Sequence, residues 1–437
     1  MDLEQYIKIK HDNDPHWFFE EIGTVSNQQR IQKILDNKDY LEGNHKILKR
    51  PNYIYNGETV ESRRIVLQTA KTLLQFQVEY LLKNEIQLTG KEKVVDTFAT
   101  VNKMGRYSFV NKEILDKMLK FGQCAEYVYL DKGKIKSKIL DPSEFTAVYN
   151  KNNEIMAVVE HFVYDAISYY TIYTENMVQE YSNEGGEIKL VAQYANLSGL
   201  PIVYSTQDEY GSIEGRSELE DWKGILDNME DLLSKTMDAT YKAITGIPVT
   251  IGQQLKGSLP ADIVGGGINL DDGASFSFQA NKTDIKSFEK LYDTLNQSLL
   301  DISMTPAVSM NKTDISNLSE VSIKLLFSLA NVKAGLNESY LKRGLIERYE
   351  KIRKLLEYRD VKMTDDEFYS LDFVFTYNQP SNETETINNL KTLREMNAVS
   401  METMLERSPY TTDAIQEMER LNSEGVNVSA ESGEEVQ

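Results

Sequence analysis

The chain has 437 residues, of which 41% are hydrophobic and 27% are charged, enough for two or three domains with apolar cores. Its 68 acidic and 48 basic residues give a net charge of −20, which argues against a protein that clamps nucleic acid with a basic face. The single cysteine, Cys124, excludes an internal disulfide framework, and no apolar run is long enough to span a bilayer. We therefore expect a soluble protein, synthesised in the cytoplasm, with a buried thiol.

The first 216 residues predict helices followed by antiparallel strands. Apolar spacing predicts helices over 26–41, 62–86 and about 112–121. Alternating patterns then predict strands over 124–131, 134–140, 145–150, 155–164, 168–174 and 177–182. The connecting segments contain Asp, Asn, Gly and Pro, as turns between such strands require. This order predicts an antiparallel meander behind a helical layer, and hence an α+β fold.

Two amphipathic helices that flank a small β insert follow. The first spans 217–246 and the second spans 284–304, and each carries one apolar stripe. The segment between them has short β pieces and glycine turns, at 265–267 and at 271–273. The pattern predicts a helical hairpin with a small domain at its tip. The first helix also carries a set of acidic residues away from its apolar stripe: Asp227, Glu230, Asp231 and Asp238.

A polar loop over 305–318 leads into the longest helical pattern of the chain, over 319–358. Asn317 and Glu320 have the spacing of a capping box, which predicts where this helix begins. Its apolar residues recur at three-, four- or five-residue steps and predict a face for the core: Val321, Leu325, Leu329, Val332, Leu336, Tyr340, Leu345, Tyr349, Ile352 and Leu356. Gly335 lies inside this pattern, and we predict a kink there.

The remaining residues predict a strand over 371–377, with a partner in the N-terminal sheet, and helices over 382–396, 400–407 and 411–422. The tail from Ser423 is acidic and has no apolar periodicity, so we expect it to be disordered.

No catalytic, cofactor or metal site is predicted. The four histidines, His11, His16, His45 and His161, lack metal-ligand spacing, and the sequence has no nucleophile elbow, Walker motif or dinucleotide fingerprint. The glycines at 265–267 are not followed by lysine and Ser/Thr at Walker spacing, so a tight turn explains them better than a phosphate loop. We predict a protein that is not an enzyme.

The order of these parts resembles the portal proteins of tailed bacteriophages, in the family typical of long-tailed phages of Gram-positive hosts. The resemblance covers roughly residues 30–422. Four stretches carry it: Tyr40-Leu-Glu-Gly43-Asn-His45-Lys-Ile-Leu48; Gly215 to Asn228; Asn317-Leu-Ser-Glu-Val-Ser-Ile-Lys324; and Val399 to Tyr410, followed by Asp413 and Glu417. Glu320 and Ser322 replace the glycine and alanine that are usual in the third stretch.

The resemblance implies a dodecameric ring at one capsid vertex of the virion, through which double-stranded DNA is packaged and ejected. It implies contacts with the terminase large subunit, a head–tail adaptor, and the major capsid and scaffold proteins, and none with a membrane. The implied parts are a wing (1–216 and 359–396), a stem (217–246 and 284–304), a clip (247–283), a tunnel loop (305–318), a long kinked helix (319–358), crown helices (397–422) and a disordered acidic tail (423–437).

This reading gives three sets of candidate site residues. The tunnel loop, with Met310, Asn311, Lys312, Thr313 and Asp314, would touch moving DNA loosely, and the clip turn, with Asp271, Asp272 and Gly273, would dock partner proteins. The acidic residues of the first stem helix, Asp227, Glu230, Asp231 and Asp238, would face either the channel or the solvent outside it. Two other functions stay open: another ring-forming virion connector or helical adaptor without a role in DNA translocation, and a cytosolic enzyme without a recognisable motif.

Overall fold

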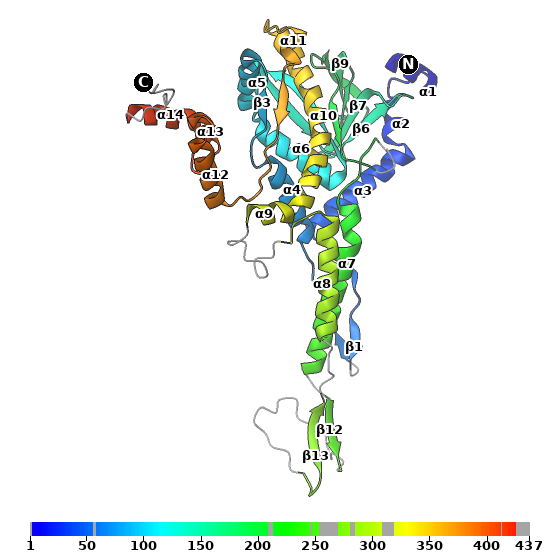
Figure 1. Cartoon of the computed structure of the whole chain (residues 1–437). Helices are drawn as coiled ribbons and strands as arrows, with labels where there is room; N and C mark the ends of the chain where they lie inside the picture. Colours follow the sequence, from blue (N-terminus) through cyan, green and yellow to red (C-terminus); the bar gives the residue numbers. More distant parts are fainter. Residues whose placement is uncertain are drawn as a thin grey trace, which may run out of the picture.

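A computed structural model describes residues 2–55, 58–208, 213–244, 247–252, 270–279, 285–307, 319–411 and 413–424. It has an α+β body, a long helical hairpin that projects from the body, and a short β-hairpin beyond the end of the helices (Figure 1). The predicted α+β class is confirmed, since all strand pairs of the described residues are antiparallel.

The N-terminal helices are distributed around the body (Figure 1). They are α1 (Leu3–Lys10), α2 (Phe18–Ile22), α3 (Val25–Glu42), α4 (Thr69–Leu82), α5 (Glu92–Gly105) and α6 (Tyr107–Phe121), with a 3-10 turn at Lys46–Lys49 and a hairpin of β1 (Tyr53–Tyr55) and β2 (Glu58–Val60). The sequence patterns located α3, α4 and α6 but missed α5, although Val94, Phe98 and Val101 are buried at helical spacing on one of its faces.

The strands form two main sheets instead of one meander. The bounds are β4 (Gln123–Asp131), β5 (Lys134–Leu140), β6 (Phe145–Tyr149), β7 (Ile155–Tyr164), β8 (Ile167–Tyr173), β9 (Met177–Ser182), β10 (Lys189–Ala195) and β11 (Ile202–Ser205). One sheet has the order β11-β4-β5 and the other β10-β9-β8-β7-β6, so the chain changes sheet between Leu140 and Phe145. Strand β10 escaped prediction because both of its faces are largely exposed and its sequence does not alternate.

The helical hairpin consists of α7 (Leu219–Ile244) and α8 (Ile285–Ile302), which pack against each other. Leu226, Met229 and Leu299 are buried at its base and join the main core of the body. Beyond it, β12 (Ile247–Ile251) pairs antiparallel with β13 (Ser275–Gln279). The prediction of two amphipathic helices with a β insert is confirmed for the described residues.

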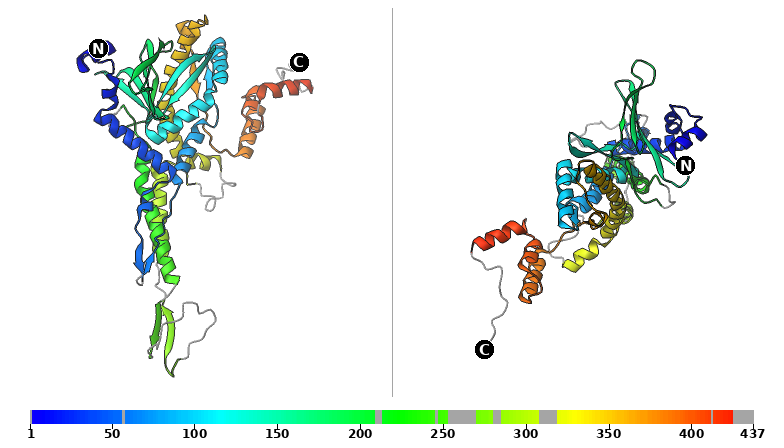
Figure 2. Two further views of the ribbon diagram at one scale, coloured as in Figure 1. Left: turned by 180° about the vertical axis from the view of Figure 1, so that it is seen from behind. Right: turned by 90° about the horizontal axis from the view of Figure 1, so that it is seen from above.

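The long helix is interrupted, but not where the sequence predicted. It consists of α9 (Glu320–Leu326) and α10 (Ser328–Tyr358), and α9 lies across the lower end of α10 (Figures 1 and 2). The break is at Phe327, with φ −92° and ψ 4°, whereas Gly335 lies within α10, so the predicted kink at Gly335 is wrong. The cap of α9 is also different, because the Ser319 side chain accepts the Ser322 N–H and Asn317 lies outside the described residues.

Helix α10 is fixed to the body by a buried ion pair. The Arg348 Nε lies 2.8 Å from a Glu126 carboxylate oxygen in β4, and the same oxygen accepts the Tyr204 hydroxyl at 2.6 Å. Burial alone would lower the pKa of Arg348, but the adjacent Glu126 carboxylate outweighs burial and leaves this pKa raised. Gly344 is required here, because a Cβ at this position would lie 2.2 Å from the Tyr204 ring.

The C-terminal residues return to the body and then leave it. After α11 (Asp365–Phe368), β14 (Asp372–Val374) pairs with β3 (Gln87–Thr89), so the partner of the predicted strand lies outside both main sheets. The helices α12 (Glu383–Glu395), α13 (Met401–Glu406) and α14 (Ala414–Ser423) form an arm that stands apart from the body in both views (Figures 1 and 2). Residues 425–437, where the disordered tail was predicted, lie outside the described residues.

Candidate functional site

The base of the helical hairpin is bound to a segment that lies far away in the sequence. Glu230, Ser234 and Asp238 follow each other at four-residue steps along one face of α7. This face receives backbone N–H groups of segment 45–67, of which residues 45–55 and 58–67 are described. Leu67 N–H donates to Glu230 at 2.8 Å, Ile65 N–H to Ser234 at 3.0 Å, and Arg63 N–H to Asp238 at 3.1 Å. The Arg50 guanidinium also pairs with Asp238 at 2.8 Å.

These contacts overturn part of the predicted acidic channel face. Glu230 is fully buried and Asp238 is 5% exposed, so these two face neither a channel nor the outer solvent, the two alternatives that were predicted. The physical reason is that segment 45–67 covers this side of α7 and uses the two carboxylates as hydrogen-bond acceptors. Asp227 is half-buried, and Asp231 is partly exposed and pairs with Lys235 at 2.6 Å. Only these last two remain candidates for a channel face.

His45 connects the body to the hairpin at this point. Its ring stacks on Tyr40 with centroids 3.9 Å apart and an interplanar angle of 8°. Its Nε2 donates to the Tyr40 carbonyl at 2.9 Å, and its Nδ1 lies 2.5 Å from a Glu230 oxygen. Because a carbonyl oxygen only accepts hydrogen bonds, the His45 Nε2 must carry a hydrogen. The contact between Nδ1 and the Glu230 oxygen also needs a hydrogen, which either of these two atoms can carry.

Gly43 makes this arrangement possible. It ends α3 with φ +101°, and a Cβ at this position would lie 2.9 Å from the Gln68 side-chain amide. The stretch from Tyr40 to Leu48 therefore has a physical role: a stacking ring, a left-handed turn, and a histidine that binds α7. The sequence pattern of this stretch indicated the portal family, but its contact with α7 was not predicted, because Glu230 is 185 residues away.

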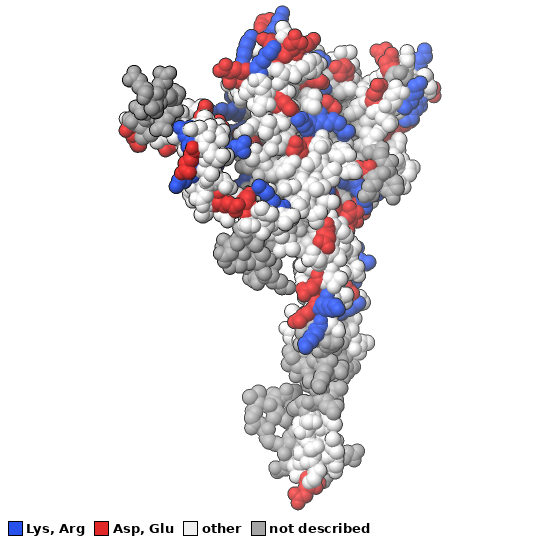
Figure 3. All heavy atoms as spheres, viewed as in Figure 1, with Lys and Arg blue, Asp and Glu red and all other residues white. Residues whose placement is uncertain are grey.

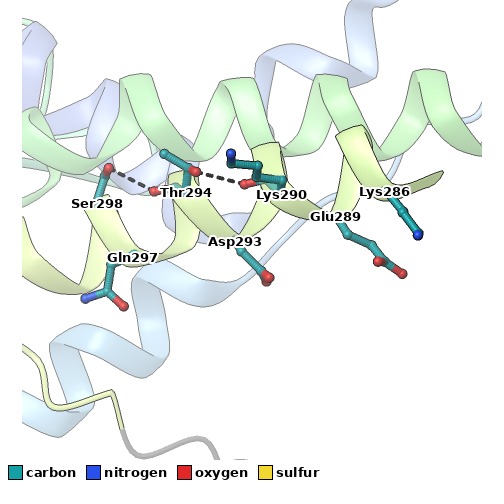
Figure 4. A pocket seen from close by; sticks show the side chains of 7 residues that line it. All are labelled: Lys286, Glu289, Lys290, Asp293, Thr294, Gln297 and Ser298. Atoms are coloured by element: carbon teal, nitrogen blue, oxygen red, sulfur yellow. Dashed lines mark hydrogen bonds between the residues drawn. The ribbon is translucent and has the colours of Figure 1, made fainter. Parts of the chain in front are cut away.

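The outer side of α8 presents a polar surface. Its residues line a shallow, open hollow: Lys286, Glu289, Lys290, Asp293, Thr294, Gln297 and Ser298. Figure 4 shows Lys286, Glu289, Asp293 and Gln297 pointing away from α7. The Thr294 and Ser298 hydroxyls donate back to helix carbonyls at 2.8 and 2.9 Å. With equal numbers of lysines and acidic residues, this side of α8 has no net charge.

The tip hairpin carries the predicted docking turn. Asp271, Asp272 and Gly273 are exposed and precede β13, and Gly273 has φ +87°, which suits a glycine. Acidic side chains are visible at this end of the molecule, while acidic and basic groups are interspersed over the visible face of the body (Figure 3). The predicted tunnel-loop residues, Met310 to Asp314, lie outside the described residues.

Within the described residues, no group of three or more His, Cys, Asp or Glu side chains could hold a metal ion. Among the described helices, none is both long enough and apolar enough to cross a membrane. Cys124 is buried in β4, and burial raises the pKa of its thiol well above the ordinary range.

Comparison with known proteins decides the family. The family described as "Phage portal protein, SPP1 Gp6-like" matches residues 25–429, which is most of the chain. The chain belongs to this family. It is accordingly a structural component of a phage-like virion, and its family implies assembly into a ring. No curated protein matches this portal-family sequence.

Among solved structures, this portal-family chain is similar to components of gene transfer agent (GTA) particles. The neck of the empty particle, computed with C6 symmetry, matches with a TM-score of 0.47 and 9% identity, over 78% of this chain and 90% of the other. The neck of the native particle, computed with C12 symmetry, matches with a TM-score of 0.43 and 9% identity, over 76% and 87%. The virion of the native particle matches with a TM-score of 0.43 and 9% identity, over 77% and 88%.

Proposed function

We propose that the chain forms a dodecameric ring at one capsid vertex and that double-stranded DNA passes through this ring during packaging and ejection. The family match over residues 25–429 carries this proposal, and the long hairpin of α7 and α8 supports it, since identical projecting hairpins can surround a channel when copies close into a ring. The other parties are the terminase large subunit, a head–tail adaptor, and the major capsid and scaffold proteins.

In this proposal the parts of the chain have distinct tasks. The body, from 1–216 and 359–396, is the wing, and the hairpin of 217–246 and 284–304 is the stem. Residues 247–283 are the clip, 305–318 the tunnel loop, 319–358 the long helix and 397–422 the crown. Because segment 45–67 binds α7 through Glu230 and Asp238, the stem and wing of one copy form a single mechanical unit.

The charge of the stem is suited to passage without binding. The open side of α8 has balanced charges, and Asp231 is neutralised by Lys235 on α7. DNA phosphates would meet no continuous basic strip there, and each such contact would add salt-dependent affinity. We propose Asp231, with half-buried Asp227 beside it, as the remaining acidic residues of the channel face.

Imaging and mass measurement test the ring. Negative-stain images of the purified chain should show closed rings with a central hole, and native mass spectrometry should give twelve copies. If the protein forms rings but variants with an altered channel package DNA normally, the alternative is favoured, a virion connector without a role in translocation. A single monomer peak at all concentrations would contradict both.

The channel, the tunnel loop and the clip each have a separate test. Asp231→Lys should slow packaging at low salt and recover at higher salt, whereas Asp366→Lys, an exposed change on α11, should not. Deletion of residues 308–318 should spare the ring but impair packaging, and normal packaging would make this loop a mere connector. Substitution of Asp271 and Asp272 by Ser should weaken binding of terminase or adaptor, and unchanged binding of both would place the docking site elsewhere.

A further inference from the structure

Five large apolar side chains form an exposed stripe along α9 and the first half of α10: Val321, Leu325, Leu329, Val332 and Leu336. Val321 and Leu325 lie one turn apart on α9, and Leu329, Val332 and Leu336 follow each other at steps of three and four residues on α10, the spacing of one helix face. They are between 38% and 70% exposed. We name this surface the α9–α10 stripe. It exposes roughly 450 Å² of apolar area, as much as the largest patch on a typical monomer and about half of what one partner buries in a standard interface.

The chain's own body cannot cover this stripe, because α10 uses its other sides to hold the body. Ala330, Leu341 and Arg348 are buried against it. Glu338 accepts the Tyr377 hydroxyl at 2.7 Å and Lys342 pairs with Asp372 at 2.7 Å, which fixes a second side to the β14 segment. The stripe occupies the side that remains.

A second surface, lined by both apolar and polar side chains, lies on the side of the body that α10 faces away from the stripe. A hollow of about 540 Å³ opens between α5, α6 and β3, and Val95, Leu345 and Phe373 are among its lining residues. Phe109 also lines this hollow and is 73% exposed. Leu345 and Tyr349 reach it from α10 about half a turn round the helix from the stripe. We name this surface the α5–α6 flank; Figure 1 shows α5 and β3 together on one side of α10.

We infer that the α9–α10 stripe packs against the α5–α6 flank of a second copy of this chain. A ring of identical copies is built from head-to-tail contacts, which need two different complementary surfaces on opposite flanks of each copy. The stripe and the flank meet this requirement in position. The hollow of the flank offers apolar side chains such as Phe109 inside a polar rim that includes Lys103 and Arg106, and a row of apolar side chains facing such a hollow allows close packing. The inference rests on the proposed ring and assigns the residues that hold it together.

Charge substitution on the stripe tests the contact. The double variant Leu329→Glu and Val332→Glu should raise the protein concentration needed for ring assembly at least tenfold, measured by mass photometry. Both side chains are more than half exposed, so the thermal unfolding of the dissociated variant should stay unchanged. The matched control is Val163→Glu with Tyr164→Glu, two exposed apolar residues at the β7–β8 turn, which should assemble as the wild type does. Unimpaired assembly of the stripe variant would overturn the inference.

Photo-crosslinking identifies the partner surface directly. Chains with p-benzoylphenylalanine at position 332 are assembled with an excess of isotope-labelled wild-type chains, irradiated and digested. Adducts that join a labelled peptide of α5 or α6 to α10 would support the inference. Rings that give only adducts within one chain, or adducts to other elements, would overturn it while leaving the proposed ring intact. Absence of rings in the wild type would refute the proposed function, and the inference with it.

Discussion

Removal of the Glu230 carboxylate should loosen the junction between the helical hairpin and the body. Glu230 is fully buried, and one of its oxygens accepts the Leu67 N–H at 2.8 Å and lies 2.5 Å from the His45 Nδ1. In Glu230→Ala, Leu67 and His45 both lose this hydrogen-bond partner in a buried site, and an unsatisfied buried group costs about 1–3 kcal/mol. The substitution also removes methylene groups and leaves a cavity, which adds to this cost. We therefore expect the free energy that holds the junction closed to fall by about 3–5 kcal/mol.

Amide hydrogen exchange measures this loss at the site itself. A decrease of about 3–5 kcal/mol in the free energy of local opening should speed exchange of the Leu67 amide roughly 10²–10⁴-fold. Glu230→Gln keeps an acceptor oxygen and should lie between wild type and alanine. The neighbouring Asp231→Ala is the control, because it breaks only a partly exposed pair with Lys235, worth about 0.3–0.5 kcal/mol. Equal exchange at Leu67 in the Glu230→Ala and Asp231→Ala variants would refute the assignment of this junction.

Three further predictions concern the body. Gly344→Ala should lower the free energy of unfolding by about 1–3 kcal/mol, because the new methyl group would overlap the Tyr204 ring. Gly335→Ala should raise it by about 0.5–1 kcal/mol, because the new methyl group would meet only the Tyr377 hydroxyl, at 3.6 Å. Denaturation midpoints measure both changes. Arg348→Ala should cost about 3–5 kcal/mol, because it leaves a carboxylate buried and unpaired, and a loss below 1 kcal/mol would show that water reaches this site. Burial alone would raise the pKa of Glu21, but its hydrogen bonds with Lys10, Tyr6 and His11 outweigh burial and lower this pKa. The stability that Glu21 gives to α1 and α2 is therefore present above the unfolded pKa of about 4.3 and is lost as the pH falls below that value. Trp17 fluorescence should report release of these helices on acidification, and Glu21→Gln should flatten this response.

Local patterns in the sequence were sufficient for the helices that project from or cross the body. Each of α7, α8 and α10 packs one face on a neighbour, and its apolar residues therefore recur at helical spacing. This spacing can be detected from the residues of the helix alone. Strands β4 to β9 were found from their β-branched and aromatic residues and from the turn residues between them, although β4 and β7 are buried on both faces over part of their length. The order of these elements, with the four stretches quoted above, also indicated the portal family, which the match over residues 25–429 confirms.

Only the tertiary structure decided what each helix face contacts. Glu230 and Asp238 were predicted to face either a channel or the outer solvent, because acidic residues away from an apolar stripe usually meet water. Segment 45–67, which is far away in the sequence, contacts them instead. The five side chains of the α9–α10 stripe were predicted to face the core, yet they are exposed. Periodicity shows that a face needs a partner, and not whether the partner belongs to the same chain. The break is at Phe327, where the sequence has no glycine or proline to mark it, whereas Gly335 has intact helix on both sides. Sequence periodicity therefore determined which residues share a face, and long-range contacts decided what that face meets.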